Sequence, residues 1–265
     1  MNILTMILHH KQLEVQGAKK QRNIKELQNS PYFNRTSTSM KNSILKGSGI
    51  IAEIKRQSPS KGVINPNVIV EEVAKGYTQA GASAISVLTD SEFFGGSNAI
   101  LSSVRAEVST PLLRKEFIID EYQIIEAKAI GADAILLIAA ALEPNMLMAL
   151  AQLAQSIGLE VLMEVHNKAE LDSHLNPYLD MVGVNNRNLK TFEVSVQTSI
   201  DLVNEIPSDF VKISESGISH PETVKKLQGF GYTGFLIGEQ FMKQESPSDA
   251  CHQFIEQIRP VVPLG

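Results

Sequence analysis

The sequence predicts an α/β fold, a single (β/α)8 barrel of the TIM-barrel type with an N-terminal helical extension. Three observations predict it. Eight short apolar runs alternate with amphipathic helical stretches, which is typical of a parallel sheet. The length of 265 residues matches one such barrel. No Gly-x-Gly-x-x-Gly follows the first run, which argues against an open dinucleotide-binding sheet.

The predicted strands follow one another along most of the chain. They are roughly Gly49–Lys55, Ala84–Thr89, Leu112–Phe117, Ala134–Ile138, Glu160–Val165, Met181–Asn185, Val211–Glu215 and Gly234–Gly238. Helical patterns between them include Val68–Gln79, Tyr122–Ala129, Asn145–Ser156 and Ser195–Glu205. Gly81 and Gly131 come just after helical stretches, where a left-handed residue ends a helix. Pro144 and Pro221 stand near predicted helix starts, where proline is tolerated.

The residues before the first strand form a separate part of the prediction. Residues 1–45 contain helical pieces such as His10–Gln28. We interpret them as an extension that caps the barrel or helps to shape the site. Residues 46–265 are then the barrel itself, one catalytic domain, because no linker is long enough for a second domain.

Composition narrows the class of protein. The net charge of −5 makes nucleic acid an unexpected partner. Cys251 is the only cysteine, so no internal disulfide can form and a reducing compartment is expected. No apolar run is long enough for a membrane span, and no basic segment precedes the apolar start of the chain as in a secretory signal. We therefore expect a cytoplasmic protein, in the simplest case a monomer, although composition leaves the oligomeric state open.

Ionisable and polar residues gather at the carboxyl ends of the strands, the face that carries the active site in this fold. In the first strand, Glu53 and Lys55 are two residues apart and point to the same side. A charged pair inside a barrel is costly unless it is used or well paired. The later strand ends supply Arg114, Lys115, Glu164, Asn185, Asn186, Arg187, Asn188, Glu215, Ser216 and Glu239. We expect one or two of them, Glu215 and Arg114 first, to be ion pairs that support the fold.

The loops after the seventh and eighth strands often bind phosphate in such barrels. Here they contain Ser216-Gly217 and Gly238, and glycine lets backbone N–H groups approach an anion closely. Lys55 and Ser58 follow the first strand, which closes the barrel against the eighth. Together these residues predict a phosphate site. Glycine at such turns can also be purely conformational.

Eight segments carry one ordered set of motifs. They are Ile51–Lys55 with Ser58-Pro59-Ser60, Leu88-Thr89-Asp90, Phe94–Ser97, Leu113–Ile118, Glu160–His166, Val184–Leu189, Ser214–Ile218 and Phe235–Gly238. The set, which spans roughly residues 40 to 245, resembles the indole-3-glycerol-phosphate synthase family. The resemblance implies ring closure of 1-(2-carboxyphenylamino)-1-deoxy-D-ribulose 5-phosphate, with loss of carbon dioxide and water, to indole-3-glycerol phosphate in tryptophan biosynthesis. It implies a carboxy-lyase that uses no metal or organic cofactor, in agreement with the lack of a Cys/His ligand cluster.

The resemblance also implies catalytic roles. Lys115 is the general acid that protonates the ketone oxygen, and we expect the neighbouring cation Lys55 to lower its pKa. Glu164 is the general base or acid of the later dehydration. Glu53 holds Lys115 or Lys55 and shares in proton transfer, and Asn185 completes the catalytic set.

Substrate binding is assigned in the same way. Arg187 is expected to clamp the substrate carboxylate with its planar fork of donors, with Asn185 beside it. Ser216 bonds a sugar hydroxyl or the carboxylate, and Glu215 also belongs to the binding set. The phosphate is assigned to Lys55, Ser58, Gly217 and Gly238, and the anthranilate ring to Phe94, Phe117 and Leu189.

Two features depart from this scheme or compete with it. Glu239 follows Gly238, where the family commonly has a small or hydroxyl residue, and its carboxylate repels a phosphate unless it turns outward. Arg187 could be a structural ion-pair partner of Glu164 or Glu215, since structural networks also use strand-end charges.

Three other functions fit parts of the pattern. Lys115 could form a Schiff base with the ketone, as in an aldolase-type barrel. The sister barrel phosphoribosylanthranilate isomerase shares the phosphate end but lacks the acids and bases that the first, third and fifth strands carry here. A non-catalytic barrel that binds a sugar phosphate, as a scaffold or sensor, needs no acid, base or clamp.

Overall fold

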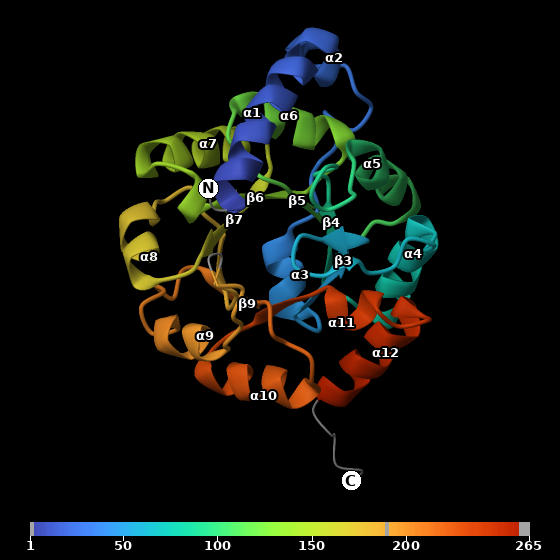
Figure 1. The fold of residues 1–265 in the computed structure, drawn as a ribbon, viewed down its shortest axis with the longest axis vertical. Helices are drawn as coiled ribbons and strands as arrows, with labels where there is room; N and C mark the ends of the chain where they lie inside the picture. Colours follow the sequence, from blue (N-terminus) through green and yellow to red (C-terminus); the bar gives the residue numbers. More distant parts are fainter. Residues whose placement is uncertain (1–2, 189–190, 260–265) are drawn as a thin grey trace.

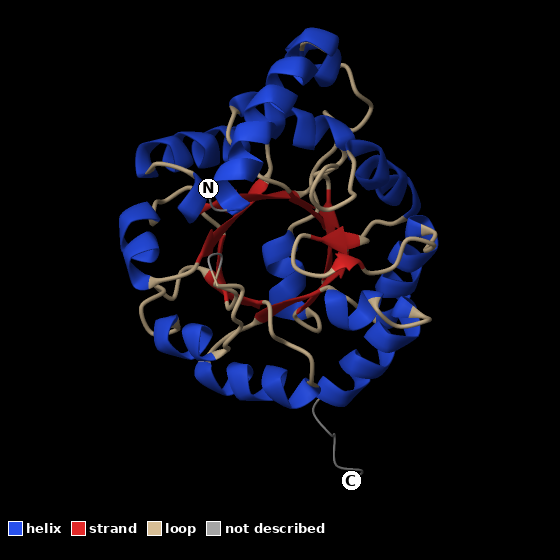
Figure 2. Ribbon diagram, in the orientation of Figure 1, coloured by secondary structure: helices blue, strands red, loops and turns tan. Residues whose placement is uncertain are grey.

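The computed structural model describes residues 3–188 and 191–259. Eight parallel strands close into a barrel, and they follow one another around it in chain order. Figure 2 shows this ring of strands inside a ring of helices. The strands are β1 (Ile50–Ile54), β4 (Ala84–Leu88), β5 (Leu112–Lys115), β6 (Ala134–Ile138), β7 (Glu160–Val165), β8 (Met181–Asn185), β9 (Val211–Glu215) and β10 (Gly234–Ile237). The predicted fold class and all eight predicted strands are confirmed.

The outer helices follow the strands as predicted, with small differences at their ends. They are α4 (Val70–Ala80), α5 (Asn98–Glu107), α6 (Glu121–Ile130), α7 (Pro144–Ser156), α8 (Lys168–His174), α9 (Gln197–Leu202), α10 (Pro221–Phe230), α11 (Glu239–Met242) and α12 (Pro247–Ile258), with a short 3-10 helix at Ala139–Ala141. Gly81 and Gly131 end α4 and α6 with φ of 90° and 98°, in the left-handed region that glycine favours. The helix predicted at Ser195–Glu205 is shorter than expected.

The N-terminal extension contains α1 (Ile3–Gln21), α2 (Ile24–Gln28) and α3 (Met40–Lys46). The single helical piece predicted at His10–Gln28 is therefore wrong in its bounds. The helix begins earlier, and a new one starts after Asn23, whose side chain accepts a hydrogen bond from the Glu26 backbone N–H while the Glu26 side chain bonds back. This capping box starts α2 and separates it from α1.

The extension contacts both ends of the barrel. Helix α3 lies behind the barrel opening in Figure 1, and its Met40 and Ile44 are buried with Ile51 and Met181 in the apolar interior of the strand ring. Helix α1 crosses the opposite rim, where Ile7 helps to line the cavity described below. Among the described residues, no helix has both the length and the apolar character needed to cross a bilayer.

A short antiparallel hairpin follows the first strand. It consists of β2 (Gln57–Ser58) and β3 (Gly62–Val63), which are joined through the Ser58-Pro59-Ser60 motif. Since β1 pairs with both β10 and β4, the hairpin stands at the point where the barrel closes. It therefore places Ser58 beside the ends of β9 and β10, as a shared phosphate site requires.

Candidate active site

A cavity of about 520 Å³ opens at the carboxyl ends of the strands, a volume suited to a small-molecule ligand. The structure brings every predicted site residue to this cavity except Leu189, which lies outside the described residues. Its lining includes Glu53, Lys55, Ser58, Phe94, Lys115, Phe117, Glu164, Asn185, Arg187, Glu215, Ser216, Gly217 and Gly238. The described part of the chain contains no group of three or more His, Cys, Asp or Glu side chains arranged to hold a metal ion.

Lys115, at the end of β5, lies at the centre of the charged groups. Its Nζ atom is 2.9 Å from Oε2 of Glu164 on β7 and 3.4 Å from Oε2 of Glu215 on β9. Both carboxylates are buried, and the lysine is nearly so. Because parallel strands direct their carboxyl ends to one face, side chains from three separate strands meet at this single ammonium group.

The pKa of Lys115 contradicts one expectation from the sequence. Burial by itself lowers the pKa, but the carboxylates of Glu164, Glu215 and Glu53 outweigh burial and raise it. The predicted lowering by Lys55 is therefore wrong. Glu53 lies against Lys55, with Oε1 2.9 Å from Nζ, so the anion offsets the effect of the neighbouring cation.

The pKa values of the two carboxylates beside Lys115 are shifted in opposite directions. Burial raises the pKa of Glu164, but Lys115 and His166 more than compensate and hold it at about 2. Burial raises the pKa of Glu215 to about 7, and the attraction of Lys115 only partly opposes that rise because Glu164 and Glu53 repel a further negative charge. Glu164 is therefore the stronger acid of the two and stays a carboxylate, whereas Glu215 holds its proton to a higher pH. Two acids held at different protonation states are typical of acid–base catalysis.

Glu53 is buried at the end of β1 and joins the same network. Burial raises its pKa, but Lys55 and Lys115 together lower it below the usual range. The Ser86 hydroxyl on β4 donates a hydrogen bond of 3.3 Å to its Oε2. Glu53 is thus held as an anion by Lys55 and Lys115, the two lysines that the sequence analysis assigned to it.

His166 supports Glu164 from the side away from Lys115. Its Nε2 lies 3.5 Å from Oε1 of Glu164, and its Nδ1 lies 3.2 Å from Oε2 of Glu170. Asn185 accepts a hydrogen bond from the Arg187 backbone N–H and contributes to the low pKa of Glu164 through its side chain. Among the described residues, no carboxylate forms an ion pair with Arg187, whose guanidinium donates to the Phe192 carbonyl at 3.4 Å.

The expected structural role of Arg114 is borne out by its contacts. Its guanidinium donates to the Gln123 carbonyl at 2.7 Å and pairs with Glu126 at 2.6 Å, away from the cavity. Glu215, expected alongside it, also forms a buried ion pair, with Lys115, but on the side that faces the cavity. Adjacent positions in the Arg114-Lys115 pair thus serve opposite sides of β5, as the period of a strand requires.

The proposed phosphate end is built from backbone with unusual geometry. Ser216 and Gly217 follow β9 with φ of 67° and 73°, and Ser216 is one of two described residues other than glycine with positive φ. Such left-handed conformations are strained outside glycine and gather at functional sites. Gly238 precedes α11, and the Glu239 carboxylate lies 3.5 Å from Nζ of Lys61, which partly neutralises it.

The aromatic end of the cavity has walls from three parts of the chain. The rings of Phe94 and Phe117 lie 6.0 Å apart at 37°. Helix α1 adds Ile3, Leu4 and Ile7. Sequence reasoning expected the extension to help shape the site but named none of these residues. The i, i+4 spacing of Ile3 and Ile7 was the available signal, since it places both on one helix face.

Comparison with solved structures supports the fold. A mutant tryptophan synthase alpha-subunit from the hyperthermophile Pyrococcus furiosus has a TM-score of 0.61 and 17% identity, over 81% of this chain and 98% of that one. Thiamine phosphate pyrophosphorylase from Pyrococcus furiosus has a TM-score of 0.59 and 13% identity, over 83% of this chain and 99% of that one.

Comparison with sequences gives the family. The family model described as "Indole-3-glycerol phosphate synthase" matches residues 4–254. An indole-3-glycerol phosphate synthase of Bacteroides thetaiotaomicron is 48% identical over 97% of this chain and 99% of its own length. One of Polynucleobacter asymbioticus is 48% identical over 77% of both. The chain belongs to the indole-3-glycerol phosphate synthase family, whose members are carboxy-lyases of tryptophan biosynthesis.

Proposed function

We propose that this chain closes the ring of 1-(2-carboxyphenylamino)-1-deoxy-D-ribulose 5-phosphate by means of Lys115, Glu164 and Glu215. The observation that carries the proposal is the position of the Lys115 ammonium group between two carboxylates of different pKa in the cavity. A ring closure of this kind needs an acid at the ketone oxygen and a base at the carbon next to nitrogen. The three side chains supply both.

In the first step, the ring carbon that bears the carboxylate attacks the ketone carbon. A carbon–carbon bond forms, and the electron pair of the C=O bond moves to oxygen, which takes a proton from Nζ of Lys115. The raised pKa of Lys115 is compatible with this role, because an alkoxide is a far stronger base than an amine. The bond to the carboxylate then breaks, carbon dioxide leaves, and the electron pair restores the aromatic ring.

In the second step, the new hydroxyl leaves as water while Glu164 removes a proton from the carbon next to nitrogen. The leaving oxygen needs a second proton, and the neighbouring Glu215 can restore the proton of Lys115 across 3.4 Å. The former ketone oxygen receives two protons before it leaves as water, and Glu164 recovers one proton from the carbon next to nitrogen. The other comes from solvent, since loss of a carboxylate as carbon dioxide consumes a proton.

Substrate binding follows the charges of the cavity. Arg187, which the described carboxylates leave unpaired, takes the substrate carboxylate, and Asn185 stands beside it. Phe94 and Phe117 pack around the anthranilate ring. The phosphate lies against Ser58, Gly217 and Gly238, with Lys55 as its cation and Ser216 at a sugar hydroxyl.

The chain organisation completes the proposal. Residues 46–265 form one catalytic domain, and residues 1–45 form an extension whose first helix covers the site. We propose that the protein acts in the cytoplasm as a monomer on a phosphorylated small molecule, with no nucleic-acid or membrane partner. Removal of residues 1–22, which spares the buried Met40, is expected to weaken substrate affinity. Unchanged affinity and turnover would contradict a role for the extension in closing the site.

The test of the reaction is a fluorescence time course of the indole product with purified protein and substrate. Borohydride added with substrate is the companion experiment. A paired, protonated lysine is a poor nucleophile, so we expect no covalent trapping of Lys115. Trapping would favour an aldolase-type Schiff base, and tight binding without product would favour a non-catalytic sugar-phosphate barrel.

A further inference from the structure

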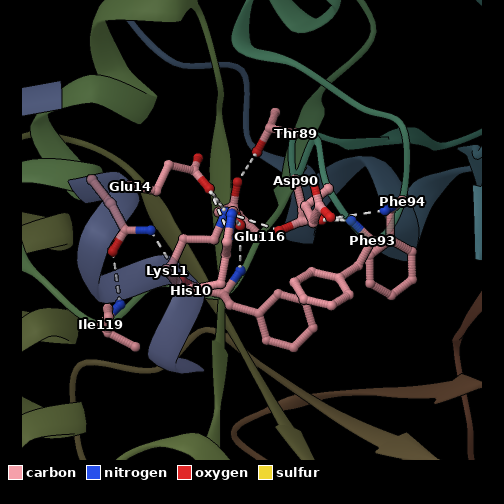
Figure 3. A network of polar contacts seen from close by, with 12 residues as sticks. His10, Lys11, Glu14, Thr89, Asp90, Phe93, Phe94, Glu116 and Ile119 are labelled. Carbon is pink, nitrogen blue, oxygen red and sulfur yellow. Dashed lines mark hydrogen bonds and ion pairs between the residues drawn. The ribbon is translucent and has the colours of Figure 1, made fainter. Parts of the chain in front are cut away.

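Lys11 of helix α1 is a buried lysine that the mechanism does not use. Its side chain is 1% exposed, and its Nζ lies 3.0 Å from Asp90, 3.0 Å from Glu116 and 2.8 Å from Glu14. Figure 3 shows these carboxylates converging on the one ammonium group. Asp90 follows β4 and Glu116 follows β5, so the contact joins the N-terminal helix to the barrel rim.

The two barrel carboxylates hold the backbone of the aromatic wall. Oδ1 of Asp90 accepts hydrogen bonds from the backbone N–H groups of Phe93 at 2.7 Å and Phe94 at 3.2 Å. Oε1 of Glu116 accepts one from the Phe117 N–H at 2.8 Å. Phe94 and Phe117 both line the cavity, and their rings lie next to each other. Each ring therefore depends on a carboxylate that Lys11 neutralises.

These carboxylates need their cation. The Asp90 and Glu116 side chains are each 1% exposed, and a buried charge that loses its partner is strongly destabilising. Burial raises the pKa of Glu116, but Lys11 and Arg114 reverse that rise and lower it. Burial lowers the pKa of Lys11, and the surrounding carboxylates raise it well above its usual value. The Lys11, Asp90 and Glu116 side chains thus form a buried cluster between α1 and the rim, with the partly exposed Glu14 at its edge.

The same helix forms part of the cavity wall. Ile7 lies one turn before Lys11, so the two share a helix face directed at the barrel. We propose that Lys11 is a positioning residue that couples docking of α1 to the placement of Phe94 and Phe117, and thereby sets affinity for the aromatic end of the substrate. The inference rests on the proposed function for the identity of that substrate.

The experiment compares Lys11→Met with Lys19→Met as a matched control. Lys19 lies on the same helix and ties it to Asp120 at 2.7 Å, but it is 46% exposed and does not line the cavity. We expect Lys11→Met to raise KM roughly tenfold, the equivalent of one lost aromatic contact, with kcat changed less than about threefold. The control is expected to keep both constants. Amide exchange at Phe94 and Phe117 should accelerate in Lys11→Met only.

A second pair of variants leaves Lys11 in place, so it tests the proposal even if Lys11→Met does not fold. Asp90→Asn keeps an oxygen that can accept the Phe93 and Phe94 hydrogen bonds, whereas Asp90→Ala removes it. We expect Asp90→Ala to raise KM and Asp90→Asn to remain near the parent. In addition, Lys11→Met combined with Asp90→Asn should regain part of the lost affinity, because one of the two uncompensated charges, that of Asp90, is gone while Glu116 remains.

The results separate this inference from the proposed function. A parent protein without turnover would contradict the function, while the exchange rates of Phe94 and Phe117 would still report on Lys11. A parent with turnover would overturn the inference if Lys11→Met kept its KM and exchange rates. The same conclusion would follow if Asp90→Ala and Asp90→Asn behaved alike.

Discussion

Nζ of Lys115 lies 2.9 Å from Oε2 of Glu164, and this pair defines the chemistry of the cavity. The lysine stays protonated because Glu164 is ionised, and Glu164 stays ionised because the lysine is protonated. Glu215 cannot ionise as readily beside an anion already in place. One cation shared by two buried acids therefore divides them into a base and an acid.

This division predicts the pH dependence of the reaction. Raising the pH through about 7 ionises Glu215, which removes a proton donor and adds negative charge beside an anionic substrate. We expect kcat/KM to fall above that pH, by about tenfold per pH unit in the limit of one essential proton. Lys115 does not cause this fall, because its pKa is raised. In Glu215→Gln, activity should be lower and the fall absent. A fall of the same shape in that variant would assign it to another group.

The position of Glu215 depends on the absence of a side chain at Gly183. A Cβ atom at this position of β8 would clash with Oε1 of Glu215 and meet Leu162 at 3.2 Å. We expect Gly183→Ala to displace the carboxylate and lower kcat roughly tenfold, the scale of one impaired proton-transfer group.

Gly229→Ala in α10 is the matched control for this substitution, because a Cβ there meets nothing within 4 Å. It is expected to leave activity unchanged and, since Gly229 lies in the last turn of α10, to stabilise the protein by less than the about 0.5–1 kcal/mol of a helix interior. Equal kinetics in both variants would show that Glu215 can move without consequence.

A core substitution at the end of the barrel opposite the cavity is expected to lower stability without lowering activity. Met40 of α3 is fully buried at the end opposite the cavity. Met40→Ala should lower the free energy of unfolding by about 2–5 kcal/mol, the range for large-to-small core changes, while kcat stays unchanged below the melting temperature. Leu45→Ala on the same helix is the control, since Leu45 is 53% exposed. Denaturant unfolding of both variants makes the comparison. Loss of kcat in folded Met40→Ala would contradict a purely structural role.

Much of the site could be predicted because it follows from local patterns. Each strand can be recognised from its own short apolar run, and the closed parallel barrel then brings the carboxyl ends of all strands to one rim. Residues as distant in sequence as Glu53 and Glu215 could therefore be assigned to one cavity before any coordinate was known. The hairpin after β1 escaped prediction because its strands have two residues each.

The features that escaped prediction depend on several contacts between residues that are far apart in the sequence. The pKa of Lys115 depends on burial and on carboxylates from three strands, so the single neighbour Lys55 gave the wrong sign. Lys11 looks like an ordinary charged residue of an amphipathic helix, and only docking on the rim reveals its partners. Local periodicity predicts that a helix forms but does not specify which surface the helix covers.

The most direct test of the central claim is the initial rate of indole formation from carboxyphenylamino-deoxyribulose phosphate by the parent, Lys115→Met and Glu164→Gln. Substrate binding and melting temperature are measured in parallel. We expect turnover by the parent and a loss of about 10²–10⁴-fold in kcat in each folded variant, the usual contribution of a general acid or base. Turnover within a few fold of the parent in folded Lys115→Met would contradict the account.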